Sequence, residues 1–276
     1  MGCRVVYWSE MQETENKELV REQFTKTAQV FGDYAVAARA TEAVKLAEMV
    51  RTSRSDTVID IACGAGTLAL RFAPLAHWAC GVDLTPAILA RAKHTAATEG
   101  LFNLDFTLAD AHRLPFADAS LDIAVTSYAL HHMRDAAGAI AEMARVVRRG
   151  GRVGVADIHV SEDRRIAELN DRIERARDCS HTRTLTIGEF ERIFRANGLR
   201  VTGIHVQENH RRFDHWLHVA GCHPGDPAYE ETRRLMESTL ENDGAGFHPR
   251  YEAIAPDAEK ELMITNTLLL IAGEKA

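Results

Sequence analysis

The sequence predicts an α/β fold in which a mostly parallel sheet lies between two layers of helices. From residue 56 onward, short apolar runs alternate with amphipathic stretches of helical period. The runs are apolar at nearly every position, which is typical of strands buried on both faces. Strand–helix alternation of this kind predicts a three-layer α/β/α sandwich.

The expected elements follow in order along the chain. Residues 1–50 have a helical pattern, in which Phe24 and Phe31 belong to one apolar face. Helices are expected near 67–73, 85–98 and 135–147. Thr186 and Glu189 form a capping-box pattern that predicts a further helix ending near Asn197. Strands are expected at residues 57–62, 78–82, 103–108, 121–127, 152–158, 199–206 and 262–272.

Three regions are predicted from this order. Residues 1–50 form an N-terminal helical cap, and residues 51–207 with 256–276 form the domain that contains the sheet. Residues 208–255 separate two expected strands and are too many for a turn. We therefore expect them to form an inserted helical cap over a substrate.

Composition excludes several classes of protein. The chain has 276 residues and a formal net charge of −7, with dispersed lysines and arginines, which argues against a non-specific nucleic-acid binder. The sequence has no run of about 18 apolar residues, so no membrane span is expected. The first residues lack the pattern of a signal peptide, so a cytoplasmic location is expected. The five cysteines form no C-x-x-C pair, which argues against a disulfide framework or a cysteine-rich zinc site.

A glycine-rich turn follows the first expected strand. Gly64 and Gly66 allow the backbone to approach a ligand, and a helix N-terminus follows them. The segment 64–69 also fits the dinucleotide fingerprint G-x-G-x-x-[GA]. Asp60, four residues before Gly64, would repel a pyrophosphate and attract a cation. S-adenosylmethionine carries an ammonium and a sulfonium and no phosphate, so Asp60 favours this methyl donor.

Acidic residues end the next two expected strands. Asp83 can accept hydrogen bonds from two ribose hydroxyls, and Leu84 can pack on an adenine face. Asp110, followed by Ala111, can accept a hydrogen bond from an adenine amino group.

Together these motifs resemble the class I S-adenosylmethionine-dependent methyltransferases, and within them the small-molecule branch (methyltransferase type 11 group) that includes the ubiquinone/menaquinone C-methyltransferases. The resemblance implies a seven-stranded sheet of order 3-2-1-4-5-7-6 with an antiparallel last strand, and a ligand crevice at the carboxyl ends of the strands. In the family pattern D-x-G-x-G-x-G, Ala62 and Leu68 replace the outer glycines, and Arg149 replaces the usual proline before the Gly-Gly turn.

The resemblance also implies the site. The donor S-adenosyl-L-methionine, with S-adenosyl-L-homocysteine as product, is expected to contact the glycine turn and the strand ends. An N-terminal aromatic helix is expected to close over it through Phe24 and Phe31. The remaining expected donor contacts are Asp60, Ala62, Gly64, Gly66, Asp83, Leu84, Asp110, Ala111, Ser127 and Tyr128.

Histidines are the candidates for chemistry on the acceptor. His131 and His132 follow the fourth strand and could take a proton as the methyl group moves. The expected acceptor contacts are Asp157, His159, His181, His215 and Trp216. The histidines of residues 210–223 match no standard zinc spacing, so no metal is expected.

The predicted reaction is direct in-line transfer of a methyl group to an O, N or C nucleophile of a small molecule. Four alternatives stay open: a quinone C-methyltransferase, an RNA or protein methyltransferase, an NAD(P)-dependent oxidoreductase, and a non-enzymatic protein that binds the donor. The sequence also leaves a homodimer open. Core motifs do not identify the acceptor, because the acceptor half of this fold varies.

Overall fold

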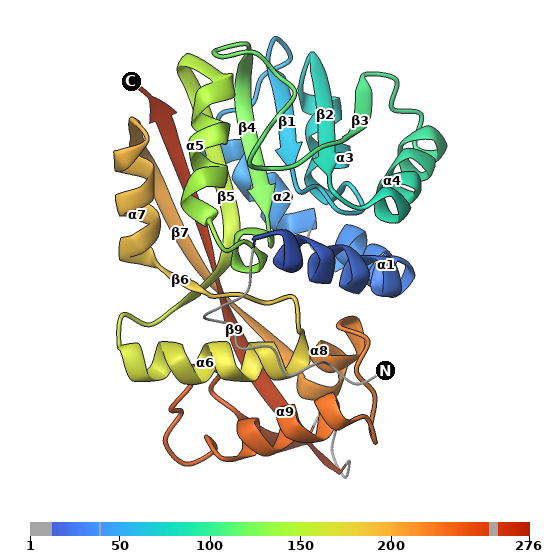
Figure 1. Ribbon diagram of the computed structural model, residues 1–276, viewed down its shortest axis with the longest axis vertical. Coiled ribbons are helices and arrows are strands. Elements are labelled where there is room, and N and C mark those ends of the chain that lie inside the picture. The colour runs from blue at the N-terminus through green and yellow to red at the C-terminus, as the bar shows by residue number, and fades with distance from the viewer. Residues whose placement is uncertain (1–12, 39, 254–258) are drawn as a thin grey trace.

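The computed structural model describes residues 13–38, 40–253 and 259–276, and the side chains of residues 29–38 lie outside this description. Its centre is a sheet whose main path has seven strands (Figure 1). In spatial order these are β3 (Leu104–Leu108), β2 (Trp78–Asp83), β1 (Thr57–Ile61), β4 (Leu121–Ser127), β5 (Val147–Val160), β9 (Lys260–Lys275) and β7 (Leu199–Arg212).

This path confirms the expected order, because β7 and β9 are the sixth and seventh long strands of the chain. β9 is antiparallel to both of its neighbours, β5 and β7, as expected of the last strand. Two short strands were not expected: β6 (Leu185–Thr186) pairs with β5, and β8 (Arg250–Ala253) pairs with β9.

Helices cover both faces of the sheet. Because neighbouring strand residues point to opposite sides, Val58 packs in one core and Ile59 in the other. The Val58 core includes helices α2 (Ala40–Met49), α3 (Thr67–Phe72) and α4 (Pro86–Thr98). The Ile59 core includes α5 (Ala136–Val146) and α7 (Ile187–Ala196). The central strands β1, β2 and β4 are therefore buried on both sides, as their apolar sequences predict, whereas the edge strands β3 and β7 are partly exposed.

Local sequence signals explain where several helices begin. Thr186 and Glu189 form the complete capping box of α7, as predicted. The Asp135 side chain accepts a hydrogen bond from the Gly138 amide at 2.8 Å and caps α5. Short 3₁₀ turns, η1 (Ala73–Leu75) and η2 (Leu130–His132), follow α3 and β4.

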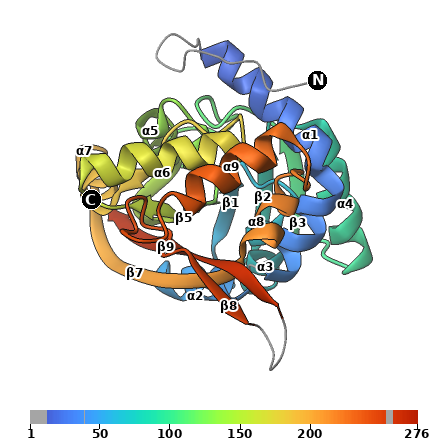
Figure 2. The same cartoon turned by 90° about the horizontal axis from the view of Figure 1, so that it is seen from below.

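A separate group of helices lies beyond the carboxyl end of the sheet, and we call this group the lobe. It contains α6 (Arg164–Arg177), α8 (Phe213–Val219) and α9 (Pro227–Glu237), and α6 packs against α9 (Figures 1 and 2). Its apolar core includes Ile173 of α6, Phe213 and Trp216 of α8, and Met236 of α9.

The strand bounds in this region differ from those expected. The strand expected to end at residue 206 continues to Arg212, and β9 begins at Lys260, so both strands run from the sheet into the lobe. Residues 207–212 of this strand are polar because β7 lies at the edge of the sheet, so no apolar run marks them as a strand. The lobe also includes α6, which precedes the expected insertion.

The N-terminal helix α1 (Glu13–Ala38) crosses between the sheet and the lobe (Figure 1). It contacts both α4 and α8. Among the described residues, no helix is long and apolar enough to cross a membrane.

Candidate active site

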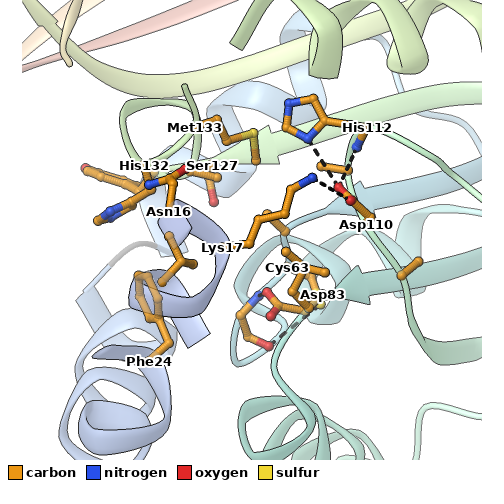
Figure 3. A pocket seen from close by; sticks show the side chains of 18 of the residues that line it. Asn16, Lys17, Phe24, Cys63, Asp83, Asp110, His112, Ser127, His132 and Met133 are labelled. Atoms are coloured by element: carbon orange, nitrogen blue, oxygen red, sulfur yellow. Dashed lines mark hydrogen bonds and ion pairs between the residues drawn. The ribbon is translucent and has the colours of Figure 1, made fainter. Parts of the chain in front are cut away.

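A cavity of about 840 Å³, including its open mouth, lies at the carboxyl ends of β1, β2, β3 and β4 beneath α1 (Figure 3). We call it the sheet-edge cavity. It lies where the strand order reverses, which is where doubly wound folds bind ligands. Its lining includes the predicted residues Phe24, Ala62, Gly64, Asp83, Leu84, Asp110, Ala111, Ser127, Tyr128 and His132.

The glycine loop forms the floor of this cavity. Gly64 and Gly66 have φ angles of 54° and 86°, in the left-handed region that favours glycine. A Cβ atom on Gly66 would lie 3.2 Å from the Phe106 ring, so this glycine also lets the loop pack against β3. Gly66 does not line the cavity. Ala62 has a φ of 52°, although the family pattern has glycine there, so this alanine holds a strained backbone.

Asp60 lies elsewhere than expected. It is buried beneath the loop, is not among the residues lining the cavity, and accepts a hydrogen bond from the Ala69 amide at 2.9 Å in the first turn of α3. Burial raises the pKa of Asp60 to about 8, so the carboxyl is largely protonated at neutral pH. The charge argument that separated a cationic ligand from a pyrophosphate therefore does not hold for this residue.

Asp83 lies at the end of β2 and faces the cavity. Its Oδ2 accepts a hydrogen bond from the Gly64 amide at 2.9 Å, and its Oδ1 accepts one from the Thr85 amide at 2.8 Å. These two bonds fix the carboxylate against the glycine loop. A carboxylate has about four acceptor positions, so two remain for a ligand.

Asp110 is tied to α1. Its Oδ2 accepts a hydrogen bond from Lys17 Nζ at 2.8 Å, and its Oδ1 accepts one from the His112 amide at 2.9 Å (Figure 3). Burial alone would raise the pKa of Asp110, but the Lys17 and His112 hydrogen bonds hold it below its usual value. The ion pair attaches the N-terminal helix to the edge of the cavity. No motif in the sequence pointed to Lys17.

Phe24 and Tyr128, both expected at the donor, line the sheet-edge cavity. Phe24 of α1 lines it, and its ring packs edge-on against the His132 ring with centroids 5.2 Å apart. Tyr128 has a φ of 49°, unusual for a bulky residue and a sign of local strain. The side chain of Phe31 lies outside the described residues.

A second cavity of about 710 Å³, including its mouth, opens toward the lobe. We call it the lobe cavity. Phe24, Tyr128 and His132 line both cavities, so the two cavities adjoin at these three residues. Its remaining lining residues come from α1, η2, the end of β5, α6 and the residue after it, β7, α8 and β9. They include His131, Glu174, Arg177, Asp178, Asn209, Arg211, Trp216 and Asn266.

His131 is oriented by a buried carboxylate. Its Nδ1 lies 2.5 Å from Asp157 Oδ1, and Asp157 Oδ2 accepts a hydrogen bond from the Leu130 amide at 2.8 Å. Burial alone would raise the pKa of Asp157, but His131 and the backbone amides hold it below its usual value. Asp157 is thus ionised and does not line either cavity. It acts on the cavity through His131.

His132 is held by a different chain of hydrogen bonds. Ser180 Oγ donates to Asp178 Oδ1 at 2.6 Å, and His132 Nδ1 lies 3.0 Å from the same Ser180 Oγ. The hydroxyl has one proton, so His132 Nδ1 must donate to it, which leaves Nε2 as an acceptor. Burial, followed by the neighbouring His131, lowers the pKa of His132 to about 3, so the ring is neutral at pH 7.

The other predicted acceptor residues are only partly brought together. Trp216 lines the lobe cavity, and the Arg177 guanidinium lies 4.4 Å from its ring centroid. His181 is buried behind His131 and its Nε2 lies 2.9 Å from Asp171 Oδ1.

His159 and His215 line neither cavity. His215 was expected to face the acceptor but lies on the exposed side of α8, because Trp216 and Leu217 occupy its buried side. Both ring nitrogens of His159 are buried, and neither has a hydrogen-bond partner among the residues that the structure describes. Among the described residues, no group of three or more His, Cys, Asp or Glu side chains could hold a metal ion.

Sequence reasoning missed four charged residues of the lobe cavity: Glu174, Arg177, Asp178 and Arg211. Arg177 and Asp178 end a highly charged helix, whose sequence resembles that of an exposed one. Arg211 lies in the part of β7 that was not recognised as a strand. Only the tertiary arrangement brings these side chains to one cavity.

Comparison with known proteins identifies the family. Residues 58–151 match the methyltransferase domain family. The chain is 32% identical over 203 residues to the uncharacterized methyltransferase YcgJ of Bacillus subtilis, which covers 74% of this chain and 80% of that protein. It is also 32% identical over 133 residues to the demethylmenaquinone methyltransferase of Corynebacterium efficiens, over 48% of this chain and 53% of that enzyme.

Solved structures agree with this result. The crystal structure of YcgJ superposes with a TM-score of 0.77 at 26% identity, over 86% of this chain and 99% of that one. A putative methyltransferase from Bacillus halodurans, with 22% identity and a TM-score of 0.77 over 85% of this chain and 99% of that one, shares the fold. From its relatives and its fold, the chain belongs to the class I S-adenosylmethionine-dependent methyltransferases.

Proposed function

We propose that this chain binds S-adenosylmethionine in the sheet-edge cavity and transfers its methyl group to a small molecule held in the lobe cavity. One observation carries the proposal: the two cavities adjoin at Phe24, Tyr128 and His132, which line both of them. A donor in one cavity and an acceptor in the other would meet at this junction. Holding them in a reactive geometry supplies much of the catalysis in a displacement with a good leaving group.

The sheet-edge cavity fits the donor. Asp83 keeps two acceptor positions for ribose hydroxyls, and its carboxylate is held in place by the Gly64 and Thr85 amides. Leu84 and Ala111 offer apolar surface for adenine, and Asp110 offers an acceptor for its amino group.

The bound donor supplies an electrophilic methyl group on a sulfonium. The chain positions the acceptor and receives its proton where the nucleophile needs to lose one. We assign the general base to His131, because the ionised Asp157 at 2.5 Å stabilises the positive charge that forms on the ring. The neutral His132 orients the acceptor through the lone pair of its Nε2.

The lobe cavity favours a polar small molecule over a quinone with an isoprenoid tail. Asn209, Arg211 and Asn266 form one of its walls, and α6 contributes Glu174 and Asp178. An apolar tail against this wall would leave the Arg211 guanidinium and Asn266 Oδ1 covered without hydrogen bonds. The inserted chain and α6 together are therefore proposed to form the acceptor site, in place of residues 208–255 alone.

Calorimetry and a transfer assay test this function. We expect S-adenosylhomocysteine to bind with at least about tenfold higher affinity than NADH, and [methyl-³H]S-adenosylmethionine to label one member of a panel of phenols, amines and carboxylic acids. Absence of S-adenosylhomocysteine binding, or tighter binding of NADH, would contradict the donor assignment. Labelling only of RNA or protein added in parallel would contradict the small-molecule acceptor.

A further inference from the structure

One wall of the lobe cavity is built from two antiparallel strands. Asn209 of β7 lies directly opposite Asn266 of β9, and side chains that face each other across such a pair point to the same side. Arg211 lies two residues beyond Asn209 and shares its face, because side chains alternate along a strand. All three residues line the lobe cavity.

The two arginines of this cavity differ in their partners. Arg177 donates to Glu174 Oε2 at 2.9 Å and covers the ring of Trp216, so its charge is balanced within the protein. In the part of the chain that the structure describes, the Arg211 guanidinium has no hydrogen bond and no ion pair. The residue opposite it on β9 is Ile264, which offers no charge.

Neither of the acidic groups of the same cavity is directed to Arg211. Glu174 accepts from Arg177, and Asp178 accepts from Ser180. The next residue on the strand, Arg212, points to the other face and pairs with Glu261. The positive charge of Arg211 also acts on its surroundings, since burial and then Arg211 lower the pKa of the nearby His215.

Asn266 adds a second, independent sign of a ligand. This side chain is 8% exposed, lines the cavity, and its Oδ1 has no hydrogen-bond partner among the described residues. A buried carbonyl oxygen without a donor is unfavourable, by an amount comparable to that of a lost hydrogen bond. A ligand that presents an N–H or O–H group at this wall would satisfy it.

From these contacts we propose that the methyl acceptor carries an oxyanion group, a carboxylate or a phosphate, which Arg211 binds, and beside it an N–H or O–H group that donates to Asn266 Oδ1. The planar guanidinium presents paired N–H donors that match either oxyanion. The nucleophile of the acceptor would then face His131 and His132, which line the same cavity. This inference rests on the proposed function, because it concerns the acceptor of that reaction.

Binding of simple probes tests the inference without knowledge of the acceptor. Benzoate and phenyl phosphate are titrated into the complex with S-adenosylhomocysteine, with benzamide as the uncharged counterpart of benzoate. We expect at least one anion to bind about tenfold or more tightly than benzamide. The stronger of the two distinguishes a carboxylate from a phosphate.

Three variants make the test specific. Arg211→Met should remove the preference for the anion, and Arg211→Lys should retain only part of it, because the charge remains without the paired donors. Arg212→Met makes the same change of charge on the other face of the strand and should leave the preference intact. S-adenosylhomocysteine affinity should stay within about twofold in all three.

Two results would overturn the inference: equal affinity for benzamide and both anions, or a preference that persists in Arg211→Met. If the unaltered protein does not bind S-adenosylhomocysteine, the proposed function itself is contradicted. In that case the same titrations on the free protein still report whether Arg211 binds an oxyanion.

Discussion

Asp83 Oδ2 accepts a hydrogen bond from the Gly64 amide at 2.9 Å, and this bond joins the end of β2 to the glycine loop that follows β1. Burial raises the pKa of Asp83, while the Gly64 and Thr85 amides oppose that rise by donating to the carboxylate. The loop therefore both shapes the sheet-edge cavity and supports the acidic residue proposed to hold the ribose.

Replacing this carboxylate should weaken donor binding. We expect Asp83→Asn to lower the affinity for S-adenosylhomocysteine about tenfold or more, because the amide keeps one acceptor oxygen and loses the charge. Isothermal titration calorimetry measures the effect. Asp105→Asn is the matched control, since Asp105 lies on β3 outside the cavity and bonds to Trp78. Equal affinity in Asp83→Asn and the unaltered protein would remove Asp83 from the donor site.

The left-handed backbone at Ala62 gives a prediction about stability. Glycine adopts a φ of 52° without the strain that a Cβ atom causes, so Ala62→Gly should raise the free energy of unfolding by about 1 kcal/mol. Urea denaturation measures this change. Ala65→Gly, in the same loop but without a positive φ, should instead lower stability through the added entropy of the unfolded chain. A destabilised Ala62→Gly would show that the alanine methyl group contributes packing that outweighs the strain.

The sheet could be predicted because its information is local. Strands buried on both faces have continuous apolar sequences. The capping-box residues of α7 likewise mark the start of that helix in the sequence. The acidic residues at strand ends were found for the same reason: Asp83 and Asp110 follow apolar runs directly, and both line the sheet-edge cavity.

Features set by distant parts of the chain could not be predicted. The second half of β7 is polar because it lies at the sheet edge, so its sequence resembles a loop. Asp60 fits a cation site by spacing alone, but the strand directs its side chain beneath the loop to Ala69. Lys17 lies 93 residues from Asp110 in the sequence, and only the fold brings the pair together.

The protonated state of Asp60 predicts a dependence of stability on pH. The pKa of Asp60 is raised from 3.8 to about 8 by burial, so the folded protein holds a proton that the unfolded chain releases. The resulting stabilisation is present in full below about pH 4 and is lost as the pH rises toward and through about 8. His132, whose pKa is lowered to about 3, has the opposite effect at lower pH. Below about pH 6.5 the unfolded chain binds a proton that the folded protein does not, so the stability rises as the pH increases to about 6.5.

Between pH 6.5 and 8, a comparison with Asp60→Asn isolates the contribution of Asp60 from that of the other titrating groups. We expect the free energy of unfolding to fall by about 1 kcal/mol per pH unit in this interval relative to Asp60→Asn, which cannot ionise. Denaturant titrations at three pH values give the slope. If both proteins show the same slope, Asp60 is ionised in the folded state, and the charge at the base of the loop must be assigned again.

The orientation of His131 by Asp157 leads to the most direct test of the chemistry. Once a methylated acceptor is known, His131→Asn should lower kcat about 100-fold, because removing a general base removes its share of the rate while the cavity stays formed. S-adenosylhomocysteine affinity should remain within about twofold, since His131 lines only the lobe cavity. His181→Asn is the control: its ring lies 5.6 Å from that of His131 but bonds to Asp171 and lines neither cavity. We expect this variant to lose stability with little change in kcat. If His131→Asn keeps the full rate and His132→Asn loses it, the lone pair on His132 Nε2 takes the proton, and Asp178 and Ser180 replace Asp157 as the groups that hold the base in position.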